Sequence, residues 1–110
     1  MLENIYDRPY NNEKEIGTAC SMTFYQVEDK NRVLVLNYYV GNNIRDMKQR
    51  YTEMNKCDVV EFYKTCELDI WNSANERRNL EIKRGIKRTP LKPMVFSDFD
   101  INSIKQILEI

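Results

Sequence analysis

Two segments rich in β-branched and aromatic residues flank a four-residue polar linker in the first half of the chain. Residues 18–27 read TACSMTFYQV, residues 32–40 read RVLVLNYYV, and the linker between them reads EDKN. Such residues favour strands, and the asparagine of the linker tolerates the left-handed backbone that a tight turn requires. Two matched runs around a short turn predict an antiparallel β-hairpin.

The second of these runs is largely apolar on both of its faces. Its alternating positions form two sets, which are Leu34, Leu36, Tyr38 and Val40 against Val33, Val35, Asn37 and Tyr39. A strand of this composition is typical of the inside of a sheet that is covered on both sides.

The rest of the chain must complete a core, because an isolated hairpin is only marginally stable. The chain has 110 residues, the size of one domain. Area scaling gives a folded surface of roughly 6,400 Å² against about 19,000 Å² unfolded, which supports one core without disulfides. Residues 1–15 are polar and acidic, and Pro9 interrupts any periodic pattern there. We therefore expect a mobile acidic N-terminal arm over residues 1–15 and a single compact domain over residues 16–110.

After the hairpin, apolar residues recur at helical spacing. Ile44, Met47, Tyr51 and Met54 lie at positions i, i+3, i+7 and i+10, and Asn43 is a suitable N-cap. This spacing predicts an amphipathic helix of about three turns.

Residues 58–71 fit two patterns about equally well. As a strand, the even positions from 60 to 70 are apolar except for Lys64. As a helix, the segment carries an apolar stripe behind Asp58 and Glu61, a pair that imitates a capping box. We favour the strand, because the segment is rich in β-branched and aromatic residues and because a third strand would give the hairpin a sheet.

A helix is predicted over residues 74–84. Ser73 and Glu76 form a capping box at its start, and Gly85 stands where a C-terminal cap belongs.

The segment after this helix is predicted to be irregular, because prolines interrupt residues 88–93. Residues 94–96 then form a short edge strand or fill the core. A last helix begins at Ser97 or Asp98, and its apolar stripe is Ile101, Ile104, Ile107 and Leu108. Together these elements predict an α+β fold, in which an antiparallel hairpin and a third strand pack with two to three helices.

Several kinds of catalytic site are excluded by composition. Histidine is absent, which removes histidine bases, Ser-His and Cys-His pairs and histidine metal ligands. The three glycines are isolated, so no glycine loop is present to cradle a phosphate. Asp98 and Asp100 fit the cap of the last helix better than a divalent-ion site, because no third acid lies at ligand spacing. We expect no enzymatic activity, no cofactor and no metal.

The cysteines indicate the compartment. Cys20, Cys57 and Cys66 are odd in number and form no CxxC pair, so neither a disulfide framework nor a zinc site is expected. The chain has no run of about 18 apolar residues, and its first fifteen residues lack the apolar region of a secretory signal. These features predict a reducing, cytoplasmic location without a membrane partner. The abundance of Asn, Ile, Lys and Tyr suits an AT-rich coding sequence, as in bacteriophages and mobile elements.

Charge is concentrated in residues 76–92. Seven basic residues stand there against two glutamates, a local balance of 7 − 2 = +5, whereas 17 basic and 17 acidic residues cancel over the whole chain. A basic segment of this kind attracts phosphates even in a neutral protein. The residues predicted to contact nucleic acid are Arg77, Arg78, Lys83, Arg84, Lys87, Arg88 and Lys92. The alternative interpretation is a solvated helix face, whose late basic residues suit the helix dipole.

A second candidate surface is aromatic. Tyrosine and tryptophan are enriched in protein interfaces, and they also pack in small cores with one wet edge. The residues predicted to form a protein interface are Tyr25, Tyr38, Tyr39 and Trp71.

The leading functional hypothesis is therefore a small, non-catalytic regulator that binds nucleic-acid phosphates. The alternative is a protein-interaction module, such as an inhibitor of a host enzyme, or a structural subunit of a larger assembly or homo-oligomer.

Overall fold

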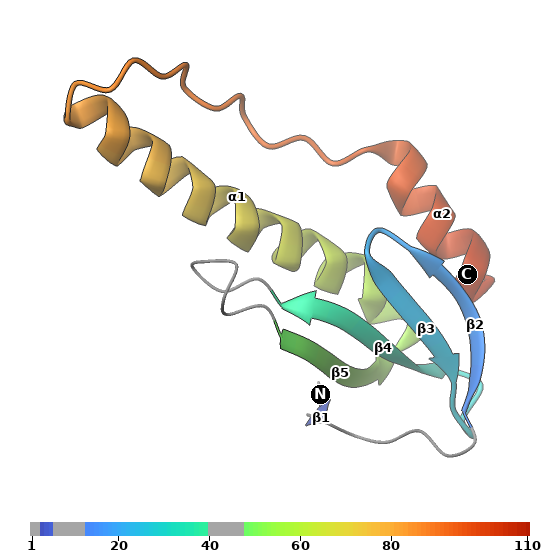
Figure 1. Cartoon of the computed structure of the whole chain (residues 1–110). Helices are drawn as coiled ribbons and strands as arrows, with labels where there is room; N and C mark the ends of the chain where they lie inside the picture. The colour runs from blue at the N-terminus through green and yellow to red at the C-terminus, as the bar shows by residue number, and fades with distance from the viewer. Residues whose placement is uncertain (1–2, 6–12, 40–47) are drawn as a thin grey trace.

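A computed structural model describes residues 3–5, 13–39 and 48–110 (Figure 1). Five strands come first and two helices follow. The elements are β1 (Glu3–Ile5), β2 (Lys14–Ala19), β3 (Met22–Gln26), β4 (Arg32–Tyr39), β5 (Lys48–Asn55), α1 (Val59–Lys83) and α2 (Asp98–Leu108). A single turn of 3-10 helix, Lys56–Asp58, joins β5 to α1. The predicted α+β class is confirmed.

The strands form one antiparallel sheet in the order β1-β5-β4-β3-β2. The predicted hairpin is present as β3 and β4, with Gln26 opposite Val33 and Met22 opposite Asn37. β4 is the middle strand of the five, and Val33, Leu34 and Val35 are all 0% exposed. The expectation of an inner strand is confirmed, and side chains on both of its faces are buried, although only the face of Val33 and Val35 packs against the helices.

The first predicted strand, 18–27, is interrupted by a second tight turn. Cys20 and Ser21 both have positive φ, at 54° and 61°, and they connect β2 to β3. Two central residues with positive φ are what a type I′ hairpin turn requires, although Asn-Gly is its usual sequence. Because Cys-Ser lacks that signature, the sequence pattern merged two strands into one.

The start of the chain contributes to the same sheet. β1 pairs with β5, with Ile5 opposite Tyr51, and β2 begins at Lys14. The remaining residues of the arm predicted over 1–15 lie mostly outside the described ranges, so its mobility stays a prediction.

The predicted helix over residues 44–54 is wrong in its described part. Residues 40–47 lie outside the described ranges, and residues 48–55 form β5, paired with β4 along eight residues from Arg32–Asn55 to Tyr39–Lys48. Thr52 and Met54 are 0% exposed, which is the two-residue alternation of a strand. A helical pattern supported by only four positions was overridden by pairing with the apolar central strand.

The predicted strand over residues 58–71 is also wrong, because this segment is the first half of α1. The helical interpretation of residues 58–71 is therefore the correct one. Val59 and Tyr63 of its apolar stripe are buried in the core. Since β5 already completes the sheet, its open face needs a helical cover instead of another strand. α1 continues without a break through Ser73 and Glu76, so that capping-box pattern starts no new helix.

α2 covers the other half of the same face of the sheet. Ser97 caps it by accepting a hydrogen bond from the backbone N–H of Asp100 (3.4 Å), as the sequence predicted. Ile104 and Leu108 are buried in the core formed by the sheet and α1. At Gly17 of β2, a Cβ atom would lie 3.2 Å from Ile107 Cγ2, so the absence of a side chain lets α2 approach closely.

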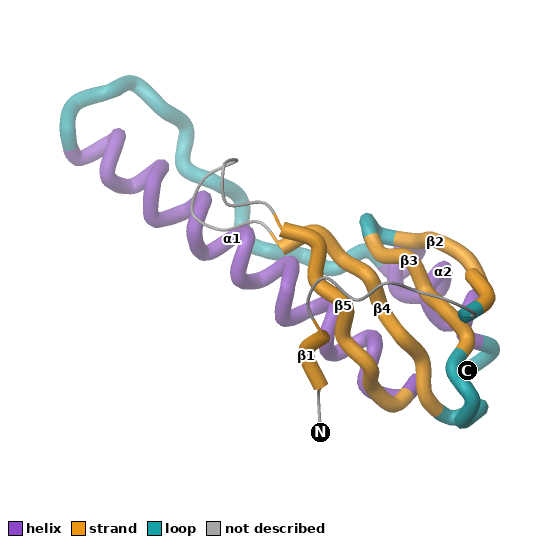
Figure 2. Tube along the Cα trace, turned by 60° about the horizontal axis from the view of Figure 1, so that its bottom comes forward, coloured by secondary structure: helices purple, strands orange, loops and turns teal. Residues whose placement is uncertain are grey.

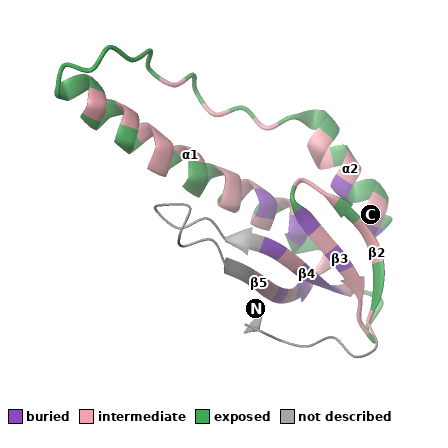
Figure 3. Cartoon of the chain, viewed as in Figure 1, coloured by how far each residue is buried: buried purple, intermediate pink, exposed green. Residues whose placement is uncertain are grey.

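The molecule is longer than a compact domain of its size. Its radius of gyration is 16.3 Å, against about 13 Å expected for 110 residues. The reason is visible in Figure 2, where the last turns of α1 extend past the end of the sheet and the chain then returns along the helix. In Figure 3 the buried residues gather where sheet and helices meet, and the extended end is mainly exposed.

Candidate nucleic-acid interface

The far end of α1 and the segment that follows it form a projection from the body of the domain. α1 has 25 residues, which corresponds to a length of about 37 Å, and only its first half packs on the sheet. We call residues 76–92 the basic projection. It contains the last turns of α1 and the first part of the returning segment (Figure 1).

A Schellman turn reverses the chain at the end of α1. Gly85 has φ +85°, its N–H donates to Ile82 O (3.0 Å), and the N–H of Ile86 donates to Glu81 O (3.0 Å). A residue with a side chain is strained at such a φ, so glycine is needed here. The turn predicted at Gly85 is confirmed, and it brings residues on both sides of it to one end of the molecule.

Three polar contacts hold the returning segment against α1. Trp71 Nε1 donates to Lys92 O (2.9 Å), and Arg78 Nη1 donates to Thr89 O (2.9 Å). Arg88 Nε forms an ion pair with Glu81 Oε2 at 3.0 Å. These contacts set the path of the backbone while most side chains of the segment stay exposed.

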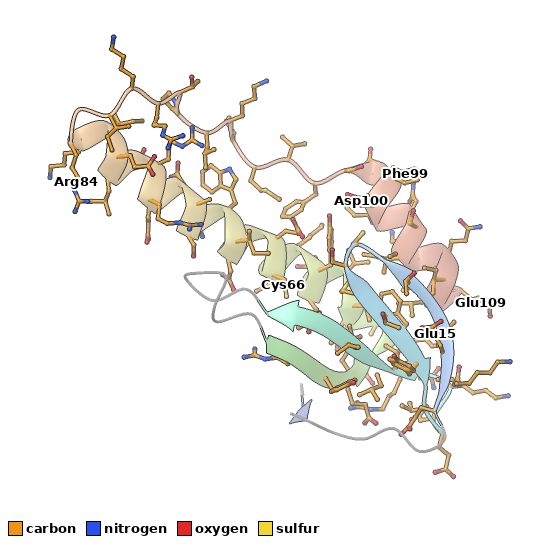
Figure 4. All side chains as sticks on the ribbon, in the orientation of Figure 1. Glu15, Cys66, Arg84, Phe99, Asp100 and Glu109 are labelled. Atoms are coloured by element: carbon orange, nitrogen blue, oxygen red, sulfur yellow. The ribbon has the colours of Figure 1, made fainter. Side chains whose placement is uncertain are left out.

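The seven basic residues predicted from the sequence all lie in this projection. Arg78 and Arg88 hold its two chain segments together. The other five are exposed and form no ion pair within the described part of the chain, and they are Arg77, Lys83, Arg84, Lys87 and Lys92. Arg84 stands at the end of α1 (Figure 4).

The arrangement of these cations suits an extended anionic partner. Arg77 and Arg84 are seven residues apart and point within about 20° of each other around the helix axis, whereas Lys83 points to a different side. Glu81 is neutralised by Arg88, which leaves Glu76 as the one unpaired acid in residues 76–92. The projection can therefore attract phosphates from more than one direction.

The predicted aromatic surface is not assembled in the described residues. Trp71 lies on α1 and faces the returning segment, through its bond to Lys92 O. Tyr25 alternates with the core residue Phe24 on β3, so it points to the opposite face of the sheet. The side chains of Tyr38 and Tyr39 on β4 lie outside the described part.

A cluster of ionisable groups lies where α1, α2 and the β2–β3 turn meet. Tyr63 donates to Asp100 Oδ2 (3.3 Å), and the Cys20 thiol lies 3.8 Å from Asp100 O. Burial, and next the charge of Asp100, raises the pKa of Glu67. The sequence contained no sign of this cluster, because its members are distant along the chain.

The half-buried thiols of Cys20 and Cys66 are poorly suited to nucleophilic chemistry. Burial raises the pKa of Cys20, and the charges of Asp100 and Glu67 raise it further. Burial is also the main cause that raises the pKa of Cys66. Because the thiolate is the reactive form, neither group is activated.

A groove of about 810 Å³ lies between the β3–β4 turn, the end of β5 and the end of α2. Its lining mixes Lys30 and Lys56 with Glu28 and Glu109, so it shows no preference for one sign of charge. Within residues 3–5, 13–39 and 48–110, no three Cys, Asp or Glu side chains group as metal ligands would. In the same ranges no helix combines the length and apolar character needed to cross a membrane.

The fold and the site define a small α+β protein with a projecting basic helix end. No protein-family model, curated protein or solved structure matches the chain.

Proposed function

We propose that this chain is a non-catalytic binding protein that contacts nucleic-acid phosphates through the basic projection. The observation that carries the proposal is the set of five exposed, unpaired cations along the outer half of α1 and the segment that returns beside it, in a molecule that is otherwise acidic. Residues 76–92 carry +5 and the rest of the chain carries −5. A local field of this kind steers a polyanion to the projection even though the net charge is zero.

The contacts proposed are with the phosphate backbone, and they carry no base readout. The exposed cations are long, flexible side chains, and no aromatic ring in the described ranges accompanies them as a stacking platform; Trp71 is held by Lys92 O. Phosphate contacts position a protein without specifying a sequence. Five such contacts on a duplex give a slope of log K against log salt of about −4.5, or about −3.5 on a single strand.

The test is fluorescence anisotropy with short labelled duplexes and single strands of DNA and RNA over a range of salt concentrations. The projection variant reverses Lys83, Arg84 and Lys87 to glutamate. The control variant reverses three exposed lysines of the body, Lys14, Lys30 and Lys105. Each variant has a net charge of 0 − 3 × 2 = −6, so a difference between them reports position and not total charge.

We expect the projection variant to lose binding and the control variant to retain most of it. Wild-type binding should weaken with salt at the slope given above. Equal loss in both variants, or wild-type binding that is insensitive to salt, would show that the projection is not the site.

The same features suggest where such a protein would work. Its three cysteines are free thiols, which suits a reducing cytoplasm. We propose an intracellular regulator of bacteriophage or mobile-element type, with support only from the AT-rich composition for its source.

A further inference from the structure

Two large apolar side chains are almost fully exposed at the start of α2. Val95 is 81% exposed and Phe99 is 78% exposed, the highest values among the apolar side chains described. Exposed apolar patches on a protein surface mark interaction sites, and these two side chains are only four residues apart. We call Val95, Phe99 and the intervening Asp98 the apolar pole.

The local structure explains why these side chains point outward. Phe96, between them, turns inward and packs edge-on against Tyr63, with ring centres 6.3 Å apart, while the Lys64 ammonium lies 5.7 Å from its ring centre. In α2, Ile104 and Leu108 occupy the buried side, so Phe99 is left on the outer side of the helix (Figure 4). The residues 94–96 predicted to form an edge strand or a core plug therefore supply one inward residue, Phe96, and one outward residue, Val95.

Two acids, Asp98 and Asp100, lie in the first turn of α2 on either side of Phe99. The nearby cations are Lys64, which lies over the inward-facing ring of Phe96, and Lys92, three residues before Val95. A partner that fits this surface must combine apolar side chains with positive charge.

The basic projection has that combination. Leu80, Ile82 and Ile86 are 51%, 37% and 48% exposed, and they alternate along the chain with Lys83, Arg84 and Lys87. The apolar residues can cover Val95 and Phe99, and the cations can pair with the acids around them. The complementarity is both apolar and electrostatic.

The tip of the basic projection, residues 80–87, cannot reach the apolar pole of its own molecule. Phe96 lies beside Tyr63 of α1, whereas the tip lies around residue 84, where the same helix ends. The 21 residues between them span about 32 Å of a straight helix, and Figure 1 shows the two surfaces at its opposite ends. The projection of one molecule can therefore reach only the apolar pole of another.

We infer that this chain associates with itself head to tail, with the basic projection of one copy seated on the apolar pole of the next. A contact between two different surfaces is heterologous, so it extends into chains or closes into rings instead of stopping at a dimer. The inference goes beyond the proposed function and is independent of it. The two share the projection, so nucleic acid should compete with association.

The test is sedimentation equilibrium over a range of protein concentrations at low and high salt. The pole variant is Phe99→Ser. The second surface variant is the double substitution Lys83→Glu with Arg84→Glu, and Leu68→Ser is the control for association. Leu68 is 43% exposed on α1 and belongs to neither surface. Circular dichroism verifies that each variant is folded.

We expect wild type and Leu68→Ser to gain mass as concentration rises, less so at high salt, and both surface variants to stay at the monomer mass of 13.2 kDa. The decisive measurement is an equimolar mixture of the two surface variants. Phe99→Ser retains a projection and the other variant retains a pole, so the mixture should form a complex of twice the monomer mass and grow no further.

Three results would overturn the inference. These are a wild-type protein that stays monomeric up to about 1 mM at low salt, a Phe99→Ser variant that still associates, and a mixture of variants that forms no complex. Anisotropy separates this outcome from the proposed function, because Phe99→Ser should bind nucleic acid as wild type does. Association without nucleic-acid binding refutes only the proposed function, and binding without association refutes only this inference.

Discussion

The two sides of α2 differ in burial so much that they predict very different mutational effects. Ile104 is 0% exposed in the core, whereas Phe99, five residues earlier, is 78% exposed. Ile104→Ala removes three buried carbon atoms. At about 0.8 kcal/mol for each buried methylene, the lost transfer free energy is about 2.4 kcal/mol, and the cavity term raises the total to about 3–4 kcal/mol.

Phe99→Ala removes a larger side chain but takes it from water. Its effect on the free energy of unfolding should stay within about 0.5 kcal/mol, the usual range for an exposed substitution. The larger deletion is therefore expected to be the milder one, which is the reverse of what residue size alone would suggest.

Urea denaturation followed by circular dichroism measures both effects, and calorimetry gives the melting temperature. For a chain of this length the entropy of unfolding is about 0.23 kcal/mol/K, so each kcal/mol corresponds to roughly 4 °C. Ile104→Ala should lower Tm by roughly 13–17 °C, and Phe99→Ala by no more than about 2 °C.

Similar destabilisation by the two variants would refute the orientation of α2 described above. It would also remove Phe99 from the surface, and with it the apolar pole as a docking site. A tolerated Ile104→Ala would show that α2 does not contribute to the core.

Three further changes test other parts of the structure. Gly85→Ala should lower the free energy of unfolding, measured by urea denaturation, by about 1 kcal/mol. A Cβ atom there meets nothing within 4 Å, so the loss comes from the positive φ of this residue. An unchanged free energy of unfolding would contradict the Schellman turn. Cys57 is exposed, whereas burial raises the pKa of Cys20 and Cys66. Mass spectrometry after iodoacetamide treatment at about pH 8 should therefore find Cys57 modified first. Equal rates of modification at all three thiols of the folded protein would show that Cys20 and Cys66 are not protected. Burial raises the pKa of Glu67 above its usual 4.5, and the charge of Asp100 adds to the effect. The folded state therefore binds more protons than the unfolded state. The contribution of the protonated carboxyl to stability is present below pH 4.5 and is lost as pH rises through the folded-state pKa. Glu67→Gln should therefore gain stability relative to wild type as pH rises from 4.5 through the raised pKa of Glu67, and a difference between the two that does not change with pH would contradict the partial burial of this carboxyl.

The part of the fold that could be predicted is the part whose local pattern has one solution. β4 is apolar on both faces and follows a short polar turn, and no helix fits that pattern. The stripe of α2 and its Ser97 cap follow a proline-containing segment that forms neither helix nor strand, so the preceding residues offered no competing pattern. In both cases the local pattern and the tertiary environment agree.

The two errors occur where the local pattern has two solutions. Met54 suits a helical stripe with Tyr51, and it also suits a strand with Thr52. Pairing with β4 decides between them, and that pairing is not visible in a window of ten residues. Because β5 supplies the third strand, residues 58–71 are not needed in the sheet and form a helix. The wrong strand at 58–71 therefore follows from the wrong helix at 44–54.

The sequence predicted which basic residues belong to the candidate site. It did not predict that they project from the body of the domain. The seven basic residues all lie within the short stretch 77–92, and counting charges was enough to find them. Their projection from the body depends on α1 running unbroken past Ser73, where a capping-box pattern imitated the start of a new helix. The apolar pole was missed because the pattern of α2 identifies which residues are buried and does not reveal whether Phe99, off that stripe, is covered by another element.

The length of α1 connects the two surfaces. A helix that ended with the sheet, near Ile70, would leave the basic residues beside the acidic body, where ion pairs within the molecule would neutralise them. Extension of α1 by about four more turns moves them roughly 20 Å away, and the returning segment then restores the chain to the core at Phe96. Within residues 76–92 the cations consequently have only Glu76 and Glu81 to pair with, so most of them can attract anions of other molecules. Nucleic-acid phosphates and the acids at the apolar pole of a second copy should therefore compete for the same cations. The protein concentration at which association is half complete should rise when nucleic acid is added.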